Sequence, residues 1–122
     1  MGGSKDFKAK GVYNYETVGK LDDIEVIRGK GKLHNSPNFA GDSHVYVRAD
    51  NRNVAREIVF YDPVTKTRSK EIHWTHSHGK YKNGEIHVHE YVNGSHNGKD
   101  RKPSEQEERL VRRARNGGIK WE

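Results

Sequence analysis

The chain of 122 residues has 23 Lys and Arg against 17 Asp and Glu, which gives a formal net charge of +6, and it has no cysteine. Its length fits a single domain. The lack of cysteine excludes disulfide bonds, zinc-thiolate sites and a cysteine nucleophile. No apolar run approaches the roughly 18 residues of a membrane-spanning helix, and the basic charge favours RNA or DNA as a partner over an anionic membrane surface.

The composition predicts a small core built from strands. Apolar residues are few for a globular chain, and Val and Ile outnumber Leu by 17 to 3, which favours strands. Residues 1–4, Met-Gly-Gly-Ser, are typical of a cloning remnant. Residues 5–122 are therefore expected to form a single domain excised from a larger protein, with its core between about residues 20 and 116.

The first predicted element is a short helix over Lys20–Arg28. Leu21, Ile24 and Ile27 recur there at spacings of three, which is a short helical stripe. Residues 29–42 then combine a glycine-rich basic loop with turn-forming residues. The N-terminal part of the chain is therefore expected to contribute one small helix.

Four strands are predicted next, over residues 44–49, 54–61, 71–75 and 84–92. The second is apolar on both faces near its end, which indicates a central strand. Short connections at near-regular spacing predict an antiparallel meander. The apolar side chains expected on one face of this sheet are Val45, Val47, Ile58, Phe60, Ile72, Trp74, Ile86 and Val88.

A C-terminal helix has the clearest signals of any element. Ser104 and Glu107 have the spacing of a capping box, acidic residues fill the first turn, arginines fill the last, and Gly117-Gly118 follow. Residues 93–102, before this helix, are predicted to be a flexible basic loop. The predicted fold class is therefore α+β: a four-stranded antiparallel meander sheet with a short N-terminal helix and a C-terminal helix.

Five of the eight histidines lie between His73 and His89. If Ile72 and Trp74 face the core, strand alternation places His73 and Thr75 on the opposite face. The same alternation in residues 84–92 places His87, His89 and Tyr91 on that face. These side chains are therefore expected to share one polar surface.

A second register is also compatible with this stretch. A two-residue turn at Asn83-Gly84 would bring together His76, His78, His87 and His89. It would also move Ile72 and Trp74 out of the core unless a bulge restored the phase. Burial of these two side chains is worth several kcal/mol, whereas the turn preference is worth about one, so the first register is favoured.

Histidine suits both proton transfers of metal-independent RNA cleavage, because its unperturbed pKa is about 6.5. The candidate catalytic residues are His73, Thr75, His87, His89 and Tyr91. The candidate nucleic-acid ligands are Arg48, Lys80, Arg101 and Lys102. This hypothesis, which favours an enzyme, needs no cofactor.

Two other functions are compatible with the sequence. Under the second register, His76, His78, His87 and His89 could bind zinc and form a zinc-dependent nuclease or hydrolase. A non-catalytic nucleic-acid-binding or phage structural module is the third hypothesis, and it predicts salt-sensitive binding without turnover.

The histidine stretch also resembles a known group of toxins. Ile-His-Trp-Thr-His-Ser-His and Gly-Glu-Ile-His-Val-His-Glu-Tyr, followed by Arg-Lys-Pro-Ser-Glu-Gln-Glu, resemble C-terminal domains of bacterial polymorphic toxins and of some phage head-associated proteins. The predicted meander resembles the barnase/EndoU/colicin/RelE-like group of toxin ribonucleases. The resemblance covers roughly Ser36 to Glu108, and the strong C-terminal helix is a departure from that group.

The resemblance implies His73, His87 and His89 as catalytic residues. It implies RNA as the substrate, with tRNA as one candidate, and a cognate acidic immunity protein as a partner. A toxin of this kind is a delivered effector that acts in the cytoplasm of a target bacterium; a protein without that role is expected to be cytoplasmic.

Overall fold

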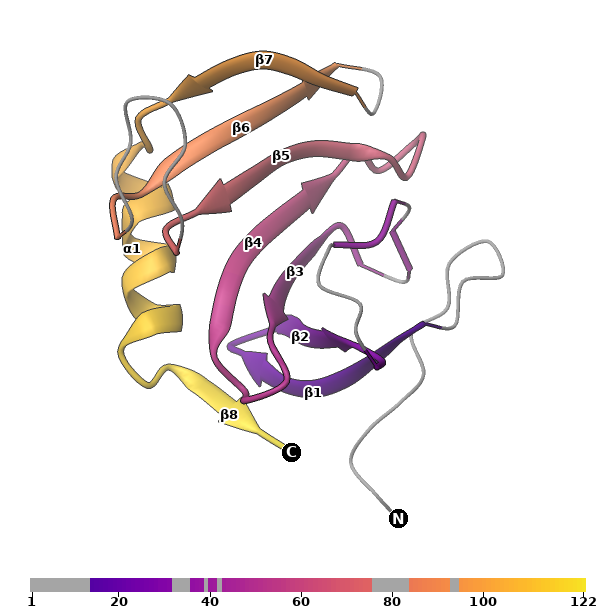
Figure 1. Ribbon diagram of the computed structural model, residues 1–122, viewed down its shortest axis with the longest axis vertical. Helices are drawn as coiled ribbons and strands as arrows, with labels where there is room; N and C mark the ends of the chain where they lie inside the picture. The colour runs from indigo at the N-terminus through magenta and orange to yellow at the C-terminus, as the bar shows by residue number, and fades with distance from the viewer. Residues whose placement is uncertain (1–13, 32–35, 39, 42, 76–83, 93–94) are drawn as a thin grey trace.

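The computed structural model describes residues 14–31, 36–38, 40–41, 43–75, 84–92 and 95–122. These residues form a mixed sheet of eight strands with one helix, α1 (Glu105–Arg115), along one of its faces (Figure 1). The strands are β1 (Tyr15–Leu21), β2 (Ile24–Gly29), β3 (Val45–Ala49), β4 (Ala55–Tyr61), β5 (Arg68–His73), β6 (His87–Val92), β7 (Ser95–Arg101) and β8 (Ile119–Trp121). Their order in the sheet is β7-β6-β5-β4-β3-β2-β1-β8.

The predicted four-stranded meander is wrong, because the sheet continues beyond it at both edges. The four predicted strands correspond to β3, β4, β5 and β6, which pair in antiparallel order. Their predicted core face is confirmed, since all eight apolar side chains belong to or pack against the cluster beneath α1. What the sequence patterns missed are the strands that flank this central group.

The predicted N-terminal helix is wrong as well: its residues form the end of β1, a tight turn and β2. Leu21 pairs with Ile24 across the turn at Asp22-Asp23. Asp22 has a φ of 54°, a left-handed conformation that Asp tolerates better than most residues. The spacing of three that suggested a helix thus comes from two apolar residues paired across a hairpin.

The remaining strands also correct earlier expectations. The predicted flexible loop at residues 93–102 contains β7, which pairs antiparallel with β6. After α1, β8 pairs with β1 at the other edge of the sheet. Gly19 makes this second pairing possible, because a Cβ there would lie 2.6 Å from the Lys120 carbonyl oxygen.

The pairing of β2 with β3 is parallel, with Val26 opposite Val47. Parallel neighbours cannot be joined by a tight turn, so the chain must cross over between them. The described parts of this crossover lie against the face of the sheet opposite α1, where Tyr61 donates a hydrogen bond to the Pro37 carbonyl oxygen. A second apolar cluster forms there from Tyr15, Ile27, Ala40, Tyr46, Val59 and Tyr61.

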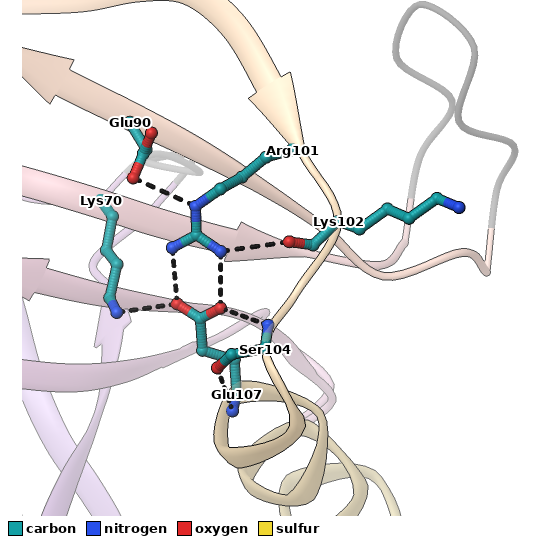
Figure 2. Close-up of polar contacts among 6 residues, drawn as sticks. All are labelled: Lys70, Glu90, Arg101, Lys102, Ser104 and Glu107. Carbon is teal, nitrogen blue, oxygen red and sulfur yellow. Dashed lines mark hydrogen bonds and ion pairs between the residues drawn. The ribbon is translucent and has the colours of Figure 1, made fainter.

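The predicted C-terminal helix is confirmed, and Glu107 attaches it to the sheet (Figure 2). The capping box with Ser104 is present. The Glu107 carboxylate also accepts two hydrogen bonds from Arg101, at 2.8 and 2.9 Å, and one from Lys70 Nζ at 2.7 Å. The bonds from Arg101 and Lys70 lower the pKa of Glu107 despite its burial, so the carboxylate is ionised and fixes the start of α1 to β5 and β7.

The described residues contain no helix that could span a membrane. At 11 residues, α1 is highly charged and too short to cross a bilayer, and the described ranges contain no longer helix.

Candidate active site

The face of the sheet opposite α1 is called the histidine face here, because β5 and β6 bring three histidines together on it. His73 lies opposite His87. The apolar residues predicted that these histidines lie on the face away from Ile72 and Trp74, and this is confirmed. Gly84 closes the connection between the two strands, with a φ of 96° and a hydrogen bond from its amide to the Trp74 carbonyl oxygen.

The three imidazoles contact one another. The ring centroids of His73 and His89 lie 4.4 Å apart, those of His87 and His89 5.1 Å, and those of His73 and His87 5.7 Å. His87 is fully buried, and His73 and His89 are 9% and 6% exposed. Polar side chains buried to this degree must satisfy one another's hydrogen-bonding groups.

Three carboxylates lie around the imidazoles, because the neighbouring strands continue the same register. Glu57 on β4 lies opposite His73, and Asp100 on β7 lies opposite His89. Glu71 lies opposite His89 on its other side. These six residues, His73, His87, His89, Glu57, Glu71 and Asp100, are called the histidine cluster.

His87 and His89 are each held through Nδ1. His87 Nδ1 lies 3.1 Å from the Glu85 carbonyl oxygen, and since a carbonyl only accepts, the proton is on Nδ1. His89 Nδ1 lies 2.7 Å from Asp100 Oδ1, an ion-pair distance at which the negative oxygen favours a proton on the facing nitrogen. In the neutral form, the basic nitrogen of each ring is therefore Nε2.

His73 has carboxylates at both ring nitrogens. Its Nδ1 lies 3.5 Å from Glu57, and its Nε2 lies 3.1 Å from Glu71. Both ring nitrogens of His73 therefore have a carboxylate partner, which fixes the ring against β4 and β5.

Glu71 is the centre of the hydrogen bonds in the cluster. Burial alone would raise the pKa of Glu71, but hydrogen bonds from His73, Ser36 and Tyr91 together hold it below its usual range. The Tyr91 hydroxyl donates at 2.7 Å. Burial and this bond raise the pKa of Tyr91, so its hydroxyl stays protonated and keeps Glu71 in place.

Arginines supply the positive charge that two of the carboxylates need. Arg48 Nε lies 3.3 Å from Glu57, and Arg68 Nε lies 3.5 Å from Glu71. Asp100 has His89 as its partner. Each buried carboxylate therefore has a cationic or protonatable group of the protein beside it, as burial of charge requires.

The structure places the predicted site residues in two groups. On the histidine face lie His73, Thr75, His87, His89, Tyr91 and Arg48. Arg101 is directed to the other face, where it binds Glu107 and Glu90, and the exposed Lys102 follows it. His76, His78 and Lys80 lie outside the described residues.

Sequence reasoning missed the acidic half of this site. Glu71 could have been found, since strand alternation places it on the same face as His73 two residues later. Glu57 could have been found in the same way, once Ile58 was assigned to the core. Asp100 gave no such signal, because its strand was predicted to be a loop.

The arrangement is compatible with two kinds of chemistry. Imidazoles with anchored Nδ1 atoms can act as general acid and base. They can also bind a metal: potential ligand atoms of His87, His89 and Asp100 lie within 4.8 Å of one another, as do those of Glu57, Glu71 and His73.

No family model, curated protein or solved structure matches this chain.

Proposed function

We propose that this chain is an endoribonuclease that cleaves single-stranded RNA by metal-independent acid-base chemistry at His87 and His89. The observation that supports it most directly is the pair of adjacent imidazoles, 5.1 Å apart, with both Nδ1 atoms anchored by oxygen. Anchoring fixes the ring orientation and leaves Nε2 as the proton-exchanging nitrogen of each.

The two histidines can be assigned different roles. Asp100 stabilises an imidazolium at His89, which favours His89 as the acid. His87 faces a neutral carbonyl group, which favours the neutral base. His87 takes the 2′-hydroxyl proton as that oxygen attacks phosphorus, and His89 protonates the 5′-oxygen as its bond to phosphorus breaks. The products are a 2′,3′-cyclic phosphate and a 5′-hydroxyl.

Charge balance favours this chemistry over a metal site. Glu57 and Glu71 lie beside Arg48 and Arg68, so the protein supplies its own counter-charges to them. A net charge of +6 suits an RNA substrate. Because His87 is fully buried, its imidazole lies away from bulk water.

The choice of nucleic acid tests this proposal. A single-stranded RNA and a DNA of the same sequence are incubated separately with the protein. Cleavage of RNA alone is expected, because the mechanism requires a 2′-hydroxyl. A single ribonucleotide placed within the DNA should restore one cut, at that position. Cleavage of the all-DNA strand would reject the mechanism, and salt-sensitive binding without cleavage of either strand would favour a binding module.

A zinc-dependent hydrolase is the second candidate, and the grouping of His87, His89 and Asp100 favours it. Tetrahedral zinc, with bonds of about 2.0–2.1 Å, needs ligand atoms about 3.3 Å apart, and His89 Nδ1 and Asp100 Oδ1, at 2.7 Å, would have to move apart to bind it together. Stoichiometric zinc that is lost in Asp100→Ala, together with a lower melting temperature in EDTA, would support this candidate. Full RNA cleavage by the metal-stripped protein would reject it.

A ribonuclease of this kind would fit the proposed role as a toxin domain from a polymorphic toxin or a phage particle. An acidic immunity protein would then complement the basic surface. Expression in a bacterial host should arrest growth, and the variant in which His87 and His89 are both Ala should not. Equal growth with both proteins would reject the toxin role without affecting the proposed chemistry.

A further inference from the structure

A second feature of the histidine face is a cleft of about 440 Å³ at the turn between β3 and β4. Clefts of this size accommodate small ligands. It is lined by Arg48, Asp50, Asn51, Arg52, Arg56 and Thr75. Three of these six side chains are guanidinium groups, whose planar set of donors matches the oxygens of a phosphate.

Asp50 holds the turn and one of the arginines in place. Its carboxylate accepts hydrogen bonds from the amides of Arg52 and Val54, at 2.8 and 3.0 Å. Its other oxygen accepts a bond of 2.8 Å from Arg56 Nε. Burial would raise the pKa of Asp50, but the bonds from Val54, Arg52 and Arg56 lower it, so the turn stays anchored at neutral pH.

Arg52 differs from its neighbours in having its positive charge available. Its side chain is exposed, and within the described part of the chain its guanidinium forms no ion pair or hydrogen bond. Arg48 and Arg56 are each balanced by a carboxylate, Glu57 and Asp50. The cleft therefore combines two fixed guanidinium groups with one unbalanced cation.

One row of paired residues on neighbouring strands connects the cleft with the histidine cluster. Arg48 lies opposite Glu57, and Glu57 lies opposite His73. Adjacent strands are about 4.8 Å apart, so this row extends from the cleft to His73 over about 10 Å. Thr75, two residues after His73, lies in the cleft wall.

We propose that this cleft binds a backbone phosphate of the same RNA strand, more than one nucleotide away from the phosphate that is cleaved. This inference rests on the proposed function and specifies how the strand is placed: Arg52 and Arg56 hold one phosphate while His87 and His89 act on another phosphate further along the strand. Single-stranded RNA fits best, since its backbone can bend between a surface cleft and buried imidazoles.

The salt dependence of RNA binding tests the proposal. In a His87→Ala background, which keeps the RNA intact, Arg52→Ala is compared with Arg112→Ala, an exposed arginine on α1 that loses the same charge. Losing one phosphate contact should reduce the slope of log affinity against log salt by about 0.7. Arg52→Ala should show this reduction, and Arg112→Ala should not. Equal slopes for the two variants would reject the cleft as a phosphate site.

A second measurement separates this inference from the proposed function. Inorganic phosphate is titrated while the Nε–H signals of Arg52 and Arg56 are followed by NMR. Saturable shifts that disappear in Arg52→Ala are expected, whether or not RNA is cleaved. Saturable shifts without RNA cleavage would reject the proposed ribonuclease function but support the cleft as an anion-binding site. RNA cleavage without saturable shifts would reject the cleft as a phosphate-binding site.

Discussion

Two networks centred on carboxylates lie on opposite faces of β5, β6 and β7, and they differ in chemistry. Glu107 accepts hydrogen bonds from Arg101, Lys70 and the Ser104 amide, so its donors are permanent cations and a backbone group (Figure 2). Glu71, on the other face, accepts from His73, Tyr91 and Ser36. The first network is built from a carboxylate, two permanent cations and a backbone group, whereas the second contains an imidazole and a phenol hydroxyl.

Strand alternation produces both networks from adjacent residues. Lys70 faces α1, and Glu71 faces the histidines; on β7 the same relation holds for Arg101 and Asp100. Because successive side chains of a strand point to opposite faces, the Glu107 network lies on one face of the sheet and the Glu71 network lies on the other. We therefore expect mutations in the Glu107 network to lower mainly stability, and mutations in the histidine cluster to lower mainly the proposed activity.

The largest expected effect on activity is that of His87→Ala. Loss of a general base should lower kcat for RNA cleavage by about 10²–10⁴-fold. His44→Ala, which removes an exposed histidine outside the cluster, is the matched control and should leave kcat unchanged. Circular dichroism and the melting temperature show whether each variant is folded. A folded His87→Ala protein with full activity would reject the assignment.

Glu107→Ala should mainly lower stability. It removes the bond from the Ser104 amide, which is one half of the capping box, together with the bonds from Arg101 and Lys70, and a loss of about 2–3 kcal/mol in the free energy of unfolding is expected. Glu105→Ala, which removes an exposed partner of Arg109 on the same helix, should cost about 0.5 kcal/mol or less. Urea denaturation measures both. Equal losses would contradict the structural role of Glu107.

Asp100→Asn should change the pH dependence of cleavage more than the fold. Without the carboxylate the charged form of His89 is less favoured, so the alkaline limb of the pH profile of kcat should move to lower pH. His73→Gln, a change at a positioning residue, is the comparison and should lower kcat without moving that limb. An unchanged alkaline limb in Asp100→Asn would remove His89 from the role of acid.

Acidification should weaken the wild-type fold through both networks. The pKa of Glu107 and that of Glu71 lie below the ordinary value of 4.5, so their stabilisation is present above that value and is lost as the pH falls through the folded-state values. The free energy of unfolding should therefore decrease from about pH 5 down to the folded-state pKa of Glu71, which is about 2. Glu107→Gln should show a smaller decrease over this range; an equal one would contradict the pKa shift.

The sequence was sufficient to predict the centre of this molecule because its signals there are local. Alternation assigned the faces of β3 to β6, and the burial of Ile72 and Trp74 selected the alternation that places His73, His87 and His89 on one face; the pairing of His73 with His87 comes from the structure. The capping box marked the start of α1 in the same way. In each case the informative residues lie within one strand, one hairpin or one helical turn.

The edges of the sheet depend instead on contacts between distant segments. β8 has three residues and pairs with β1 about a hundred residues earlier, and β7 is a polar strand without apolar alternation. The parallel pairing of β2 with β3 likewise has no local signature. Asp100 and the arginine cleft, which depend on these pairings or on a loop, could not be assigned in advance.

The most direct test of histidine acid-base cleavage is to identify the 3′ ends of RNA fragments produced by the protein in EDTA. The mechanism predicts 2′,3′-cyclic phosphate ends, formed at the same rate with and without the chelator, and no cleavage by the variant in which His87 and His89 are both Ala. Fragments with 3′-hydroxyl ends, or cleavage that stops in EDTA, would contradict it.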